Sequence, residues 1–216
     1  SIPFLFMKLR DVMTVLESIA PFDTAEEWDN VGLQVGEPGS EIRSVLVALD
    51  ASFAVIRGAA RSKTDLVITH HPLRLRPLSR LDMSQGVAKK LAMIIRGRMN
   101  LVSMHTNLDK APGGVADELA ASLNLREVCS YGALRTGTLK KRMPLRDWVR
   151  GLPFQTGRIC DAGKDVLKVG ACPGSGMEYW QQARTLGCDT MVTGHDRYHD
   201  DLDEREDGKN VGDMAQ

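Results

Sequence analysis

Short apolar runs alternate along the chain with longer segments whose apolar residues recur at helical spacing. The apolar runs, typical of buried strands, occupy 44–50, 65–69, 100–104, 165–172 and 189–193. The pattern of amphipathic helices occupies 7–20, 53–62, 84–98, 113–125 and 176–187. Strands separated by helices of this length are typical of βαβ units, so we predict an α/β fold with largely parallel sheets. Residues 130–165 are less regular.

The chain also resembles itself at a shift of 124 residues. The pattern of the segment 45–71 then recurs in 169–195, as one strand–helix–strand unit repeated. The identical pairs are Val45 with Val169, Asp65 with Asp189, Thr69 with Thr193, and His71 with His195. We therefore predict two similar α/β halves, 1–126 and 127–216.

Composition excludes few classes of protein. Lys plus Arg equals Asp plus Glu, 28 each, so no overall field attracts nucleic acid or an anionic membrane. No apolar run approaches the roughly 20 residues that span a bilayer. The opening Ser1–Phe6 lacks a basic segment and a cleavage site, and we expect an extension rather than a signal peptide. The four cysteines form no C-x-x-C pair, which favours a reducing cytoplasm.

Histidines follow the carboxyl ends of three predicted strands. They are His70 with His71, His105, and His195 after one glycine. In an open parallel sheet this edge is where ligands bind. A single histidine near a strand end is more often a hydrogen-bonded structural residue, but the shared edge favours a common site.

Asp109 follows His105 by four residues and adds a carboxylate to this edge. Mixed imidazole and carboxylate ligation suits zinc, iron, manganese, cobalt or nickel better than magnesium or calcium. We therefore predict that His70, His71, His105 and Asp109 bind metal. Two divalent ions about 3.5–4 Å apart would suit a hydrolytic site, with Asp109 bridging them.

Three other features have weaker signals. His195 and His199 are four residues apart, which suits either an additional metal or substrate site or a solvated surface. Asp29 and Asn30 lie in the turn-rich segment WDNVGLQVG, where they suit positioning of substrate or water, or simply Asx turns. The turn CPGSG at 172–176 lacks a P-loop lysine, and we expect a tight turn that opens a helix.

The ordered motifs resemble a known family. WDNVGLQVG, VLVALDAS, DLVITHHPL, LVSMHTNLDKAPGGVADELA and a final D-x-x-V-T-G segment are similar to those of the GTP cyclohydrolase I type 2 family, also called interacting-factor-three-like. The resemblance runs from about Leu9 to Gly194. It implies two α/β halves with a metal cleft between them, two metal ions per subunit held by the histidines and aspartate named above, and a homohexameric ring built from trimers.

The carboxyl end departs from this family pattern. The family has Thr-Gly-Glu where this chain has Thr193, Gly194 and His195, and its later Gly-His and Glu are missing. We expect that the carboxyl end is truncated or divergent, or that His195 and His199 substitute for the missing ligands.

Two functions remain open on the sequence. The first is a cytoplasmic, metal-dependent hydrolase of a nucleotide or small phosphorylated substrate, acting through metal-activated water; the family name implies ring opening of GTP. The alternative is a non-catalytic, ring-forming metal-binding or protein-interaction module. Nucleic-acid binding receives little support from zero net charge.

Overall fold

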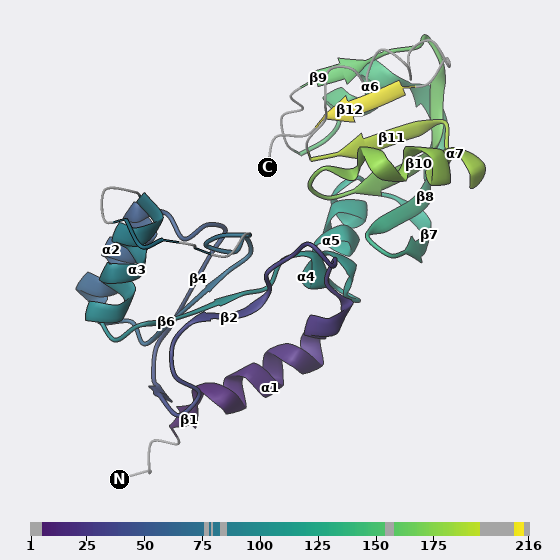
Figure 1. Ribbon diagram of the computed structural model, residues 1–216. Helices are drawn as coiled ribbons and strands as arrows, with labels where there is room; N and C mark the ends of the chain where they lie inside the picture. Colours follow the sequence, from purple (N-terminus) through teal and green to yellow (C-terminus); the bar gives the residue numbers. More distant parts are fainter. Residues whose placement is uncertain are drawn as a thin grey trace. The chain divides into compact units, whose positions relative to one another are not determined.

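The chain folds into two compact units, Ser1–Ala111 and Pro112–Gln216 (Figure 1). The computed structural model describes residues 6–75, 78, 80–82, 86–153, 158–194 and 210–213. Both units combine helices with a mixed sheet, which confirms the predicted α/β class. In this described part of the chain, no helix is long and apolar enough to cross a membrane.

The first unit contains a four-stranded sheet in the order β2-β6-β5-β4. Its strands β4 (Val45–Ala48), β5 (Leu66–Thr69) and β6 (Asn100–Ser103) are parallel, and β2 (Gly32–Val35) is antiparallel to β6. A second, small antiparallel sheet joins β1 (Met7–Lys8) to β3 (Glu41–Ile42).

Alternate residues of the parallel strands face two apolar layers. Val67 and Leu101 pack with Ile56 of α2 (Phe53–Ser62) and Ile94 of α3 (Gly86–Arg96). Leu66 and Val102 instead pack with Leu9 of α1 (Leu9–Ile19). Because both of their faces are covered, β5 and β6 read in the sequence as continuous apolar runs. The short elements η1 (Phe22–Thr24) and α4 (Thr106–Lys110) complete the unit.

The second unit contains a six-stranded sheet in the order β7-β8-β10-β11-β12-β9. Strands β10 (Asp165–Cys172), β11 (Thr190–Thr193) and β12 (Asn210–Asp213) are parallel. Strands β7 (Arg126–Tyr131), β8 (Leu134–Pro144) and β9 (Arg158–Cys160) pair antiparallel. The helical elements are α5 (Val115–Ser122), α6 (Leu145–Arg150), η2 (Gly176–Tyr179) and α7 (Trp180–Thr185).

The internal similarity of the sequence corresponds to a structural repeat. The order β2-β6-β5-β4 has its counterpart in β9-β12-β11-β10, with one antiparallel strand beside three parallel strands each time. The register agrees as well, since Val45 pairs with Leu66 as Val169 pairs with Thr190. The two units are therefore similar halves, with the hairpin of β7 and β8 added to the second.

Two local predictions differ from the structure. The region from 130 that looked irregular contains most of the β7–β8 hairpin, whose turn includes Gly132 at φ +62°. Helix α5 belongs with the second unit, although the sequence division at 126/127 placed it in the first half. It does so because Leu119 and Leu123 pack among the apolar side chains of β8 and β10.

The CPGSG turn is structural. The Gly176 N–H donates to the Thr193 hydroxyl at 2.8 Å, and that hydroxyl donates to the Gly174 carbonyl at 2.8 Å. A Cβ on Gly176 would lie 2.5 Å from the Cβ of Cys172, so the backbone packs too closely for any larger residue. The expected tight turn at the start of a helical segment is confirmed.

Candidate metal centre

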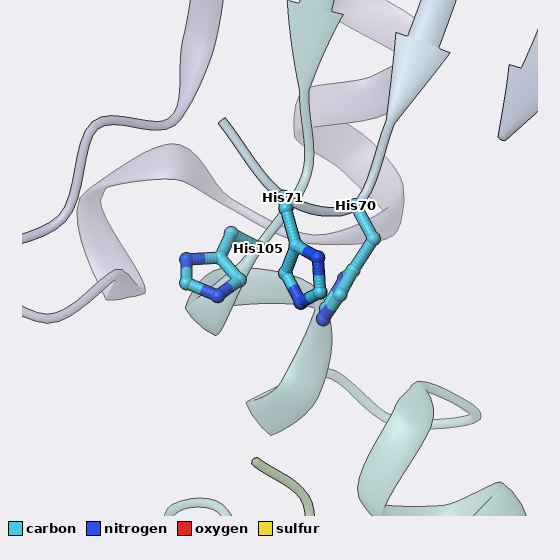
Figure 2. Close-up of side chains that lie close together, drawn as sticks. All are labelled: His70, His71 and His105. Carbon is cyan, nitrogen blue, oxygen red and sulfur yellow. The ribbon is translucent and has the colours of Figure 1, made fainter. Parts of the chain in front are cut away.

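Three histidines converge at the carboxyl edge of the first sheet (Figure 2). His70 and His71 directly follow β5, and His105 follows β6 by one residue. The ring centroids are 4.9 Å apart for His70 and His71, 5.0 Å for His70 and His105, and 5.4 Å for His71 and His105. One nitrogen of each ring lies within 4.8 Å of the other two, which is close enough to share a metal ion.

Each imidazole is held through its Nδ1 atom. The Nδ1 of His70 lies 2.9 Å from the Met104 carbonyl, and the Nδ1 of His71 lies 2.8 Å from Asp50 Oδ1. The Nδ1 of His105 lies 2.9 Å from Asp29 Oδ1. Because these oxygens accept hydrogen bonds, Nδ1 carries the proton in each neutral ring and Nε2 keeps its lone pair. Such outer contacts orient the histidine ligands of metal sites.

The partner of His105 is a fully buried carboxylate. Asp29 has no exposed side-chain surface, and its Oδ2 accepts hydrogen bonds from the backbone N–H and hydroxyl of Thr106. The Asn30 N–H donates to Oδ1 at 2.7 Å. Burial alone would raise the pKa of Asp29, but the hydrogen bonds from His105, Thr106 and Asn30 together lower it below the ordinary value of 3.8.

Asp109 reaches the same edge because α4 makes one helical turn after His105. Its N–H donates to the His105 carbonyl at 3.0 Å, which places the two side chains on one face. Its Oδ1 lies 3.6 Å from His70 Nε2. This oxygen is buried and accepts no hydrogen bond from the described residues. Burial raises the pKa of Asp109 to about 6.

His70 presents a bare lone pair to that oxygen. Burial, followed by the charge of His105, lowers the pKa of His70 to about 4, so the ring is neutral at pH 7. Its proton lies on Nδ1, toward Met104, so two electron-pair donors face each other without a proton between them. A cation between the two donors would accept electron pairs from both of them. The donor set of imidazoles and carboxylate fits a divalent transition metal or zinc.

The other predicted residues lie in different places. Asn30 is beside the centre in sequence, but its side-chain amide donates to the Arg74 carbonyl at 2.7 Å and to Gln34 at 3.1 Å. Its role in positioning substrate or water stays a prediction, as does that of Asp29. His195 and His199 lie outside the described residues.

Sequence reasoning missed two contributors to the centre, Asp50 and Thr106. Asp50 lies at the carboxyl end of the predicted strand 44–50, so the same edge argument that selected the histidines could have found it. The hydroxyl and N–H of Thr106 anchor Asp29 across 77 residues of chain, which no local pattern indicates.

Comparisons with known proteins show the family of the chain. The family model of Duf34/NIF3 (NGG1p interacting factor 3) matches residues 7–215. A GTP cyclohydrolase 1 type 2 homolog of Clostridium perfringens (strain 13 / Type A) is 32% identical, over 97% of this chain and 85% of that protein.

Solved structures share the fold. The Staphylococcus aureus protein SA1388 has a TM-score of 0.88 at 27% identity, over 97% of this chain and 86% of that chain. Reduced HcgD from Methanocaldococcus jannaschii has a TM-score of 0.82 at 29% identity, over 98% of this chain and 88% of that chain. The match of the family model to nearly the whole chain, together with the relative at 32% identity, shows that this chain belongs to the Duf34/NIF3 family, whose relatives include the GTP cyclohydrolase 1 type 2 homologs.

Proposed function

We propose that the chain is a metal-dependent hydrolase that acts on a nucleotide or small phosphorylated substrate. One observation carries the proposal: the buried Asp109 Oδ1 lies 3.6 Å from His70 Nε2 and accepts no hydrogen bond from the described residues. In a folded protein, two such donors are stable together when a cation lies between them. The relatives' name, GTP cyclohydrolase 1 type 2 homolog, suggests the substrate class.

His70, His71, His105 and Asp109 would hold the metal, and we propose two ions per subunit from the family resemblance. A divalent ion supplies Lewis acidity and lowers the pKa of a water molecule toward 7. The protein residues fix the imidazole tautomers, keep His70 neutral and supply one negative charge from Asp109. Asp29 and Asp50 hold the rings of His105 and His71 in position.

Elemental analysis and a GTP hydrolysis assay on the purified full chain test this proposal. We expect bound zinc, iron, manganese, cobalt or nickel, and turnover that a chelator abolishes. His70→Ala and His105→Ala should each lose metal and activity together, whereas Arg61→Ala, on an exposed part of α2, should retain both. Stoichiometric metal without hydrolysis of GTP or other nucleotides would contradict the hydrolase and favour the alternative.

The alternative is a ring-forming metal-binding or interaction module, and one surface supports it. Val45, Val47 and Leu49, on and just after the edge strand β4, are all exposed. Alternate residues of a strand face one side, so these three form an apolar strip suited to subunit contact. We propose a homohexamer from the family resemblance, and sedimentation of wild type and Val47→Asp would test it. A smaller assembly in the variant would support this contact.

A further inference from the structure

Trp28 leaves its indole in solvent beside the histidine cluster. It is 58% exposed, whereas Trp148 and Trp180 are 7% and 5% exposed and lie in two separate apolar clusters of the second unit. The Trp28 ring lies 6.0 Å from that of His105, centroid to centroid, with the planes at 76°. The two rings are therefore not stacked on each other.

The backbone that carries Trp28 is tied down on both sides. Before it, the Glu26 N–H donates to the Thr106 hydroxyl at 2.9 Å, and the Glu26 carboxylate pairs with Lys110 Nζ at 2.6 Å. After it, Asp29 accepts hydrogen bonds from Thr106. The exposure of the indole is thus not the result of a loose loop. The residues that flank Trp28 attach to the segment that also carries the candidate ligands His105 and Asp109.

We propose that Trp28 is a ring-binding wall of the candidate centre, which stacks on a planar heteroaromatic ring of the substrate. This inference rests on the proposed function, because it requires a ligand whose other atoms reach the histidines. Aromatic rings contact each other at centroid separations of about 4.5–7 Å, so one small ligand can contact both Trp28 and the cluster. Stacking accepts any flat ring, which indicates a class of substrate, such as nucleobase compounds, rather than one base.

Two probes that differ only in the ring test this proposal. Guanosine 5′-monophosphate and ribose 5-phosphate share the sugar phosphate, and only the first has a base. Calorimetric titration of the metal-loaded full chain should show tighter binding of the guanosine compound. Trp28→Ala should weaken that binding roughly 5- to 100-fold and leave ribose 5-phosphate unchanged. Trp28→Phe should retain most of the affinity, because a smaller ring still stacks.

Ile95→Ala provides the matched control. Ile95 is 61% exposed, similar to Trp28, but lies near the carboxyl end of α3, at the opposite end of the sheet from the histidines. Its loss should change neither titration. Equal affinity of wild type for the two probes, or unchanged binding of the guanosine compound to Trp28→Ala, would overturn the proposal. A changed sedimentation mass with unchanged binding would assign the indole to a subunit contact and would also overturn it.

Measurement of metal content and GTP hydrolysis on the same samples distinguishes failure of the Trp28 proposal from failure of the proposed hydrolase function. A chain that binds the guanosine compound through Trp28 but shows no hydrolysis supports the ring-binding wall and contradicts the hydrolase. A chain that hydrolyses GTP, with Trp28→Ala equal to wild type in binding and rate, contradicts the wall and leaves the hydrolase standing.

Discussion

The carboxylates that hold His105 and His71 differ in burial, so we expect the two imidazoles to be held with unequal firmness. Asp29, which holds His105, is fully buried and accepts hydrogen bonds from Thr106 as well. Asp50, which holds His71, has a side chain that is 57% exposed. Water can replace a hydrogen bond at an exposed carboxylate, but not at a buried one. His105 is therefore the more firmly positioned ligand.

The difference in burial between Asp29 and Asp50 predicts unequal effects of two matched substitutions. Asp29→Asn should lower metal affinity about 10- to 100-fold, the usual range for loss of a residue that orients a ligand. Asp50→Asn should lower it several-fold less. Competition with a chromophoric chelator measures both affinities, and the visible absorption of the Co²⁺ form shows whether the ligand geometry changes. Equal losses of metal affinity, or a loss in Asp29→Asn that merely follows unfolding seen by circular dichroism, would contradict the firmer positioning of His105.

At the scale of elements, the parallel strands were predictable from their apolar runs, because both faces of β5 and β6 are buried and the edge strand β4 carries apolar residues even on its exposed face. The runs at 44–50, 65–69 and 100–104 became β4, β5 and β6. Strand β2, which lies within WDNVGLQVG, was not predicted, because Gly32 and Gln34 suggested a turn. The position of the site was also predictable, because the sheet edge at which the histidines gather follows from the topology. The orientation of their rings was not, because it depends on contacts distant in sequence, such as that between Asp29 and His105.

The repeated halves share one aspartate contact near the amino-terminal end of a parallel strand. Asp65 Oδ2 accepts the N–H groups of Arg43 and Ser44 at 2.9 and 3.0 Å. Asp189 Oδ2 accepts those of Leu167 and Lys168 at 3.0 and 3.1 Å, and each of these residues lies 124 positions after its counterpart. Each aspartate thus holds the backbone beside a parallel neighbour, just before β4 begins in the first half and inside β10 in the second.

Removal of either aspartate should destabilise the chain. We expect Asp65→Ala and Asp189→Ala each to lower the free energy of unfolding by about 1–2 kcal/mol, because backbone N–H groups lose charged acceptors. Their effects should add in the double variant, since the sites share no partner. Urea denaturation measures the changes, and Asp147→Ala, which removes an exposed ion pair with Arg150, should stay within about 0.5 kcal/mol. Losses no larger than in this control would contradict the shared role.

For the whole molecule, the candidate centre opposes stability when no metal is bound. Burial raises the pKa of Asp109 from 3.8 to about 6. The folded state therefore holds this proton more tightly than the unfolded state does. Its contribution to stability is complete below pH 3.8 and is lost as the pH rises through about 6. At neutral pH the metal-free chain must keep an ionised carboxylate, buried and without a hydrogen bond at Oδ1, beside a neutral His70.

Asp109→Asn removes the buried, ionised carboxylate, so the metal-free variant should be more stable than metal-free wild type. The advantage should grow by roughly 1–2 kcal/mol between pH 5 and pH 7 and then level off, because one pKa unit corresponds to about 1.4 kcal/mol. The pKa of His70, lowered from 6.5 to about 4, reduces the stability of both proteins as the pH falls from about 6.5 to 4, so the comparison uses the difference between them. Urea denaturation of chelator-treated protein across this pH range measures the difference. An advantage that shrinks with rising pH would contradict the prediction, whereas added metal should reverse the order, because the chain that retains the carboxylate binds metal more tightly and is stabilised more by it.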